Sequence, residues 1–177
     1  MTENSDYSQV VQLLRAESEA IAKAASRLQA EDLERVLSIL TNCKGKIVLL
    51  GVGKSGIIAQ KIAATMTSSG TAAVYLHPSD ALHGGLGIVS SDDVVMLLSN
   101  SGETAELLEL LPYLKRRDVP LLAIVGKVKS TIAKRADAVV GSYAWSTGRP
   151  SRMDRALDRL PQWATRLGTS GLVPGYQ

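Results

Sequence analysis

Residues 46–56 read KIVLLGVGKSG, an apolar run followed at once by a turn rich in glycine. From Ser55 to Ser69 the apolar residues recur at helical spacing among residues that favour helices. A short apolar run, a tight glycine turn and an amphipathic helix are typical of the strand–helix unit of an α/β protein. This stretch therefore predicts a buried strand that leads through a tight turn into a helix.

The turn GVGKSG at 51–56 partly matches a phosphate-binding Walker A loop. That loop requires Gly, four intervening residues and then Gly-Lys-Ser or Gly-Lys-Thr. With Gly-Lys-Ser at 53–55, the first glycine belongs at position 48, where the sequence has Val48 inside the apolar run. The spacing therefore argues against a P-loop.

The same turn also matches the dinucleotide-binding pattern, with Gly51, Gly53 and Gly56 at the required spacing. An enzyme of this kind needs in addition a carboxylate at the end of the second strand, where it binds the ribose hydroxyls. The sequence has His77 at that place, and Asp80 comes three residues later. The missing carboxylate argues against a nicotinamide-dependent enzyme.

Apolar runs of strand length alternate with amphipathic segments along most of the chain. This alternation predicts a parallel sheet covered by helices on both faces. Ligands of such sheets bind beyond the carboxyl ends of the strands, so the loops at those ends are expected to gather on one edge. We expect helices at 7–28, 30–41, 55–69, 104–117 and 129–135, strands at 46–50, 72–76, 93–99, 120–125 and 137–140, and edge loops at 51–56, 77–87, 99–104 and 126–130.

A second loop, SNSGET at 99–104, also follows an apolar run and opens a helix. Ser99, Ser101 and Thr104 offer hydroxyl donors, and Gly102 allows the backbone to approach a ligand closely. The amino terminus of the following helix adds unpaired N–H groups and the positive end of the helix dipole. The loop is a candidate anion cup, and an ordinary helix cap by Ser101 is the alternative.

The composition predicts one soluble, cytoplasmic domain. No apolar run approaches the roughly 18 residues of a membrane span, and no signal peptide is recognisable at the start. Cys43 is the only cysteine, which excludes an intrachain disulfide, and we expect it to pack as a small apolar residue. In residues 1–141 the 15 Lys and Arg balance the 15 Asp and Glu. We therefore expect neither a nucleic-acid nor a membrane partner.

The two loops and their surroundings resemble the sugar isomerase (SIS) family, and within it the arabinose-5-phosphate isomerases. The resemblance implies a three-layer α/β/α domain with a five-stranded, flavodoxin-like parallel sheet behind two N-terminal helices. It also implies a homo-oligomer, usually a tetramer, that interconverts ribulose 5-phosphate and arabinose 5-phosphate for the lipopolysaccharide sugar Kdo. The matching segments are GVGKSGIIAQKIAATMTSSGT, HPSDALHGGLGIV, DVVMLLSNSGETAELLELLPYLKRRDVPLLAIVG and STIAKRADAVV.

The resemblance also implies roles for individual residues. An aldose–ketose isomerase moves a proton through an enediol, so it needs a base, and the family has its catalytic glutamate at the position of Glu106. Lys54 would stabilise charge on the substrate or the enediolate, and His83 would contact the substrate or a divalent metal. Apart from that metal, no cofactor is expected. The implied substrate-binding residues are Gly53, Ser55, Ser99, Asn100, Ser101, Gly102, Glu103 and Thr104.

Two carboxylates, Glu103 and Glu106, stand beside the cup, three residues apart, and we expect them on one helical face. Their mutual repulsion favours raising the pKa of one of them. The alternative is that both are first-turn glutamates stabilised by the helix dipole. His77 has no support as a site residue and is expected to be structural.

From residue 142 the sequence departs from the family pattern. The family continues with a second catalytic glutamate and with a histidine that serves a neighbouring subunit, usually followed by two CBS modules. We therefore expect N-terminal helices that pack on the domain at 1–43, an SIS phosphosugar-binding domain at 44–141, and a truncated or divergent, loosely ordered tail at 142–177 that contains Arg, Trp and Pro. Two functions follow: an arabinose-5-phosphate isomerase, or a non-catalytic phosphosugar-binding module that lost the chemistry.

Overall fold

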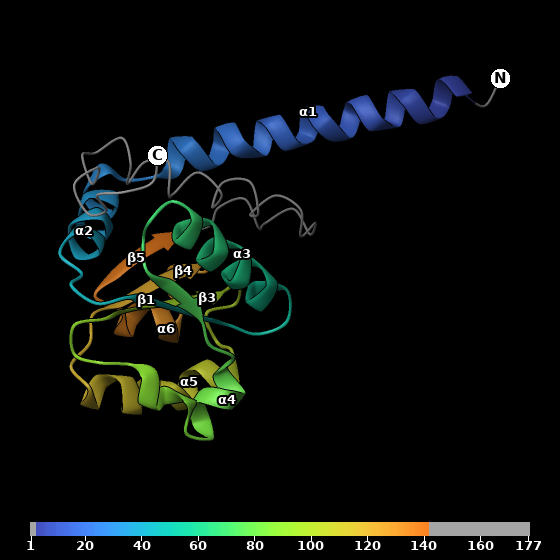
Figure 1. Cartoon of the computed structure of the whole chain (residues 1–177). Coiled ribbons are helices and arrows are strands. Elements are labelled where there is room, and N and C mark those ends of the chain that lie inside the picture. The colour runs from blue at the N-terminus through green and yellow to red at the C-terminus, as the bar shows by residue number, and fades with distance from the viewer. Residues whose placement is uncertain (1–2, 142–177) are drawn as a thin grey trace, which may run out of the picture.

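A computed structural model describes residues 3–141, and the expectations for 142–177 lie outside the described residues. Strands and helices alternate from the first strand onward (Figure 1). The strands are β1 (Ile47–Gly51), β2 (Ala73–Tyr75), β3 (Val94–Ser99), β4 (Leu121–Val125) and β5 (Ala138–Gly141). The helices are α1 (Glu3–Arg27), α2 (Ala30–Thr41), α3 (Lys54–Ser68), α4 (Pro78–Leu82), the 3-10 helix η1 (Gly85–Ile88), α5 (Ala105–Arg116) and α6 (Thr131–Arg135).

The five strands form one sheet in the order β2-β1-β3-β4-β5. Every neighbouring pair is parallel. Val48 of β1, for example, pairs with Val74 of β2 on one side and with Val95 of β3 on the other. This strand order is that of flavodoxin-like, doubly wound folds, so the predicted fold class is confirmed.

Helices cover both faces of the sheet. Helices α2 and α3 pack on one face, and α4, η1, α5 and α6 pack on the other (Figure 1). Within β1, Val48 and Leu50 belong to the apolar cluster under α5, whereas Ile47 and Leu49 belong to the cluster under α3. Because both sides of the strand are buried, it must be apolar at every position, as its sequence is.

An ion pair between the partly exposed Lys46 and the buried Asp93 joins the amino ends of β1 and β3. Asp93 is 1% exposed, and its Oδ2 lies 2.7 Å from Lys46 Nζ. The backbone N–H groups of Lys46 and Ser90 also donate to this carboxylate, each at 2.8 Å. Burial alone would raise the pKa of Asp93, but the hydrogen bonds outweigh it and hold the pKa below its ordinary value. The ionised carboxylate therefore connects the two strands whose opposite ends carry the predicted binding loops.

Cys43 packs against the apolar cluster under α3, as expected from the sequence. Burial, the largest influence, raises the pKa of its thiol. Since the thiolate is the reactive form, Cys43 is a poor nucleophile at neutral pH.

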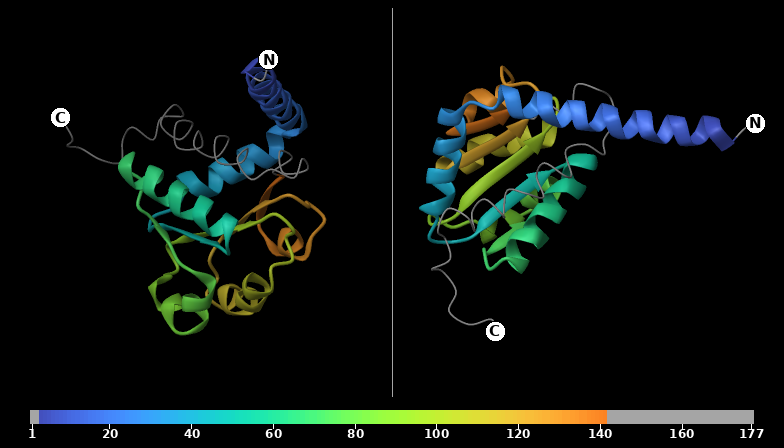
Figure 2. Two further views of the ribbon diagram at one scale, coloured as in Figure 1. Left: turned by 90° about the vertical axis from the view of Figure 1, so that its right-hand side faces the viewer. Right: turned by 90° about the horizontal axis from the view of Figure 1, so that it is seen from above.

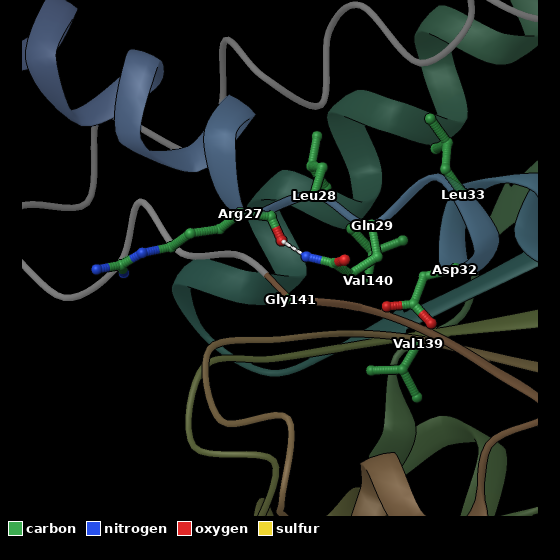
Figure 3. Close-up of a pocket in the computed structure, with 8 residues that line it drawn as sticks. All are labelled: Arg27, Leu28, Gln29, Asp32, Leu33, Val139, Val140 and Gly141. Atoms are coloured by element: carbon green, nitrogen blue, oxygen red, sulfur yellow. Dashed lines mark hydrogen bonds between the residues drawn. The ribbon is translucent and has the colours of Figure 1, made fainter.

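Helix α1 projects away from the sheet for much of its length (Figures 1 and 2). The junction of α1 and α2 lies against β5, where residues 27–29, 32–33 and 139–141 line a small hollow of about 10 Å³ (Figure 3). A space of this size holds at most one water molecule. Across residues 3–141, no helix has both the length and the apolar character that crossing a membrane requires.

The loop predicted at 77–87 contains two short helices, α4 and η1. Pro78 occupies the first turn of α4, where its missing N–H costs no hydrogen bond. His77 is the N-cap residue, and its Nδ1 accepts a 3.2 Å hydrogen bond from the N–H of Ser79. His77 is therefore structural, as expected. Gly84, with φ of 105°, directly precedes η1.

Candidate functional site

The sheet has its topological switch point between β1 and β3. From β1 the chain crosses to β2 on one side and then returns to β3 on the other side of β1. Gly51 at the end of β1 pairs with Leu98, one residue before the end of β3, so the loops that follow begin side by side. Ligands of doubly wound sheets bind at such a point. The two predicted binding loops, 51–56 and 99–104, therefore flank one site.

The turn after β1 depends on its glycines in two ways. Gly53 has φ of 57°, a conformation that favours glycine, and the place of a Cβ there is open space. Gly56 lets the helix approach the strand, because a Cβ at this position would lie 2.8 Å from Gly51 O and from the Tyr75 hydroxyl. That hydroxyl donates a 2.9 Å hydrogen bond to Gly51 O, and burial raises the pKa of Tyr75. The hydrogen bond from Tyr75 therefore holds the turn on the side that packs against β2, and the space beside Gly53 is open.

Residues 99–104, called the anion cup below, are organised by their own hydroxyl groups. Ser99 is 1% exposed, and its Oγ accepts a 2.9 Å hydrogen bond from the N–H of Gly102. The same Oγ lies 2.7 Å from Oγ1 of Thr104. Ser101 is exposed, and its Oγ accepts a 3.1 Å hydrogen bond from the N–H of Glu103. These internal hydrogen bonds shape the cup, with Ser99 inside and Ser101 at the surface.

The helices that begin at the switch point lack side-chain N-caps. Helix α3 begins after Gly53, which has no side chain, and α5 begins after Thr104, whose side chain accepts no hydrogen bond from the first-turn N–H groups. In contrast, α4 and α6 are capped by the side chains of His77 and Ser130. Uncapped first turns leave backbone N–H groups for a bound anion. The ordinary cap by Ser101 considered for α5 is not formed, which favours the anion cup.

The three residues predicted to be catalytic lie on three helices. Lys54 is the first residue of α3 and is exposed, and Glu106 is the second residue of α5 and is half-buried. Both therefore stand in first turns at the switch point. His83 is the exposed C-cap residue of α4, which follows β2 and packs against α5.

The remaining predicted contacts also lie on the two loops. Ser55 is half-buried in the first turn of α3. Asn100 is exposed, and its C=O accepts a 3.1 Å hydrogen bond from the N–H of Gly126 after β4. The structure thus brings the predicted residues of 53–55 and 99–106 to one edge of the sheet.

Glu103 differs from its expectation. Helix α5 begins two residues after it, so Glu103 does not share a helical face with Glu106. Its Oε1 accepts a 2.7 Å hydrogen bond from the N–H of Thr131, the first residue of α6. This bond, with smaller contributions from Lys134 and Lys127, holds the pKa of Glu103 below its ordinary value. A raised pKa is therefore wrong for Glu103.

Sequence reasoning missed three residues that shape this edge. Tyr75 contacts Gly51 across 24 residues, and no local pattern signals that contact. Ser130, 5% exposed, caps α6 by accepting a 3.4 Å hydrogen bond from the N–H of Ala133, and Thr131 binds Glu103. A serine directly before a helix, as Ser130 is, is a typical N-cap signal, and it indicates that Ser130 caps α6.

A larger hollow of about 900 Å³ lies by the last turns of α5 and α6, near the amino ends of β4 and β5. It is at the opposite edge of the sheet from the switch point. Within residues 3–141, no group of three or more His, Cys, Asp and Glu side chains could hold a metal ion. The divalent metal implied at His83 therefore has no such ligand set in this part of the chain, and no step below uses one.

The sequence model of the SIS domain family matches residues 39–142, and the chain belongs to this family. The match includes the whole sheet and both loops. The chain is 43% identical over 131 residues to arabinose 5-phosphate isomerase KpsF of Escherichia coli O6:H1 strain CFT073, which covers 74% of this chain and 40% of the relative. It is 40% identical over 149 residues to arabinose 5-phosphate isomerase KdsD of Pseudomonas aeruginosa. That alignment covers 81% of this chain and 45% of the relative.

A solved structure, that of E. coli CFT073 c3406 in complex with arabinose 5-phosphate, has the same fold, with a TM-score of 0.83 and 32% sequence identity. The superposition covers 94% of this chain and 93% of that one. The chain spans less than half the length of the two curated relatives above. The family resemblance found in the sequence is confirmed.

Proposed function

We propose that the chain is an aldose–ketose isomerase that interconverts ribulose 5-phosphate and arabinose 5-phosphate through an enediol. The proposal is carried by two helix amino termini at the switch point that have no side-chain cap and are lined by serine and threonine hydroxyls. Relatives named arabinose 5-phosphate isomerase, and a neighbour solved with arabinose 5-phosphate, support the choice of a pentose phosphate. The arabinose 5-phosphate would serve the synthesis of Kdo for lipopolysaccharide.

The phosphate would bind in the anion cup. A dianion there is stabilised by the N–H groups and the positive end of α5, and Ser101 and Thr104 offer hydroxyl donors. Ser55 in the first turn of α3 would complete the contacts from the opposite loop, with Gly53, Asn100 and Gly102 providing close backbone approach. Fixing the phosphate fixes the sugar carbons relative to the base.

Proton transfer would use Glu106 as the base. Its carboxylate removes the proton from the carbon next to the carbonyl, and the electrons form the enediolate. The proton then returns to the former carbonyl carbon, while the hydroxyl proton of the first carbon passes to the enediolate oxygen and leaves the new aldehyde. Lys54, across the switch point, would stabilise the negative oxygen of the enediolate. His83 would contact the substrate hydroxyls from the β2 side.

A second candidate is a non-catalytic phosphosugar-binding module. The observation that favours it is in the sequence: no glutamate follows Glu109 and no histidine follows His83. Residues 110–177 therefore do not supply the further catalytic glutamate and histidine that the resemblance implies. The two candidates share the anion cup and differ only in turnover.

The deciding experiment gives the purified chain ribulose 5-phosphate in deuterium oxide and follows the products by NMR. Turnover through an enediol that exchanges with solvent places deuterium at the second carbon of arabinose 5-phosphate. Glu106→Gln should lower kcat by a factor of about 100 or more while binding is kept. Glu109→Gln, three residues later on the same helix and exposed, is the matched control and should leave kcat unchanged.

The outcomes separate the candidates. Binding of arabinose 5-phosphate without turnover would contradict the isomerase and support the binding module. Absence of binding would contradict both.

We also propose that the chain forms a homo-oligomer through α1. Leu14 and Ile21 of α1, and Leu28 directly after its last residue, follow one another at intervals of seven residues and are 56%, 47% and 36% exposed. Apolar residues that recur at every seventh position lie on one face of a helix, and such a face can pair with another helix. Self-association would remove this apolar surface from water.

A further inference from the structure

In the described part of the chain, three hydrogen bonds tie the anion cup to the segment that follows β4. The N–H of Gly126 donates to Asn100 O, and the N–H of Ile132 donates to Gly102 O, each at 3.1 Å. The third runs from the N–H of Thr131 to Glu103 Oε1 at 2.7 Å. It is the shortest of the three, it is the one that uses a side chain, and it joins residues 28 positions apart.

The same two segments also touch at Gly102. This residue has φ of 65°, and a Cβ on it would overlap the side chain of Ser130. Ser130 is itself buried, where it caps α6. The amino terminus of α6 is thus held from two sides, by Ser130 of its own segment and by Glu103 of the cup.

We infer that Glu103 is a positioning residue, which caps α6 and thereby holds the anion cup in the shape that receives phosphate, without contacting the substrate. This inference rests on the proposed phosphosugar function. It replaces the substrate contact expected from the resemblance. The reason is electrostatic: a carboxylate in contact with a phosphate dianion would repel it, whereas at Thr131 the same charge accepts a backbone N–H.

The charges around Glu103 support this role. The hydrogen bond from Thr131 favours the ionised form of the carboxylate. Lys134 and Lys127, which stand near it, favour that form to a smaller extent. Two cations near the carboxylate also offset the negative charge that it adds beside a phosphate site. The cap is therefore present throughout the neutral pH range.

The test compares Glu103→Ala, Glu103→Gln and Glu109→Ala in the full chain. Glu103→Gln keeps an acceptor oxygen, and Glu109 is an exposed glutamate on α5 whose side chain has no such partner in the described residues. Three quantities are measured: amide hydrogen exchange at Thr131 without substrate, the affinity for inorganic phosphate, and the KM and kcat for ribulose 5-phosphate.

For Glu103→Ala we expect about tenfold faster exchange at Thr131, about tenfold weaker phosphate binding and a matching rise in KM, with kcat within about twofold of wild type. Glu103→Gln should return all three toward wild type, and Glu109→Ala should change none. Unchanged exchange at Thr131, or unchanged phosphate affinity, would overturn the inference. So would a fall in kcat at constant KM, because it would place Glu103 on the reacting atoms.

The failures of the two proposals are distinguishable. A wild-type chain that binds phosphate but does not turn over ribulose 5-phosphate contradicts the isomerase alone. The exchange and phosphate measurements then still decide the role of Glu103, because neither requires turnover.

Discussion

Oγ of Ser99 lies 2.7 Å from Oγ1 of Thr104, so two hydroxyls that the sequence predicts to bind phosphate are hydrogen-bonded to each other across the anion cup. Ser99 is buried and also accepts the N–H of Gly102. Its hydroxyl therefore organises the loop from inside, while Thr104 is half-buried and Ser101 is exposed, where they would stand nearer to a ligand bound in the cup. We therefore expect the Ser99 hydroxyl to shape the cup and the hydroxyls of Ser101 and Thr104 to contact the ligand.

Replacing Ser99 and Ser101 by alanine should separate these two roles. Ser99→Ala leaves the buried N–H of Gly102 without its acceptor, which costs about 1–3 kcal/mol of stability, and it should weaken arabinose 5-phosphate binding as well. Ser101→Ala removes an exposed hydroxyl, so it should weaken binding with less than about 1 kcal/mol lost in stability. Urea unfolding and calorimetric titration measure the two effects. Equal stability of the two variants would contradict a structural role for Ser99 that Ser101 does not share.

The close approach of α3 to β1 predicts a large effect of one methyl group. Gly56→Ala places a Cβ at 2.8 Å from Gly51 O and the Tyr75 hydroxyl, so the free energy of unfolding should fall by about 1–3 kcal/mol. Gly87→Ala is the matched control, because its Cβ would meet no atom within 4 Å. The control should stay within about 0.5 kcal/mol of wild type in urea unfolding. A Gly56→Ala protein as stable as the control would show that the turn can relax.

Asp93 should make stability depend on acid pH. Its folded pKa lies below the unfolded value, so its contribution is complete above the unfolded pKa, about 3.9, and is lost as the pH falls through the folded pKa. Asp93→Asn should lower stability at pH 7 by about 2–3 kcal/mol and flatten the decline below pH 4. Asp92→Asn, at the exposed neighbour, should reproduce wild type. Denaturant unfolding from pH 7 to pH 2 tests this, and parallel curves for wild type and Asp93→Asn would refute it.

Sequence periodicity was sufficient to predict the sheet, because the sheet is covered on both faces. All six residues of β3 are buried, for example, so the strand stands out as one apolar run. The predicted loops also gathered on one edge, since parallel strands all end on the same side. The place of the candidate site, at the carboxyl ends of the strands, follows from the same rule. The glycines of its two loops, Gly53 and Gly102, have positive φ.

Contacts between distant loops were not predictable in this way. The side chain of Glu103 reaches a backbone N–H 28 residues away, and that depends on two loop conformations without any periodic signal. Its position beside a helix suggested a helical face shared with Glu106, but α5 begins only at residue 105. Helix α4 was missed because its segment begins with Pro78 and is followed by Gly84, Gly85 and Gly87, residues that favour loops, whereas the equally short α6 lies between two apolar strands.

The exposed face of α1 predicts that a single charge will disrupt self-association. Ile21→Glu places a carboxylate between Leu14 of α1 and Leu28, the residue after α1, where burial against a partner helix would leave the charge unpaired. We expect the mass measured by light scattering during size exclusion to fall from that of the oligomer to that of a smaller species. Gln12→Glu adds the same charge at another exposed position of α1 and should leave the mass unchanged. If Ile21→Glu keeps the wild-type mass, α1 does not form the interface, and association must use another surface of the domain.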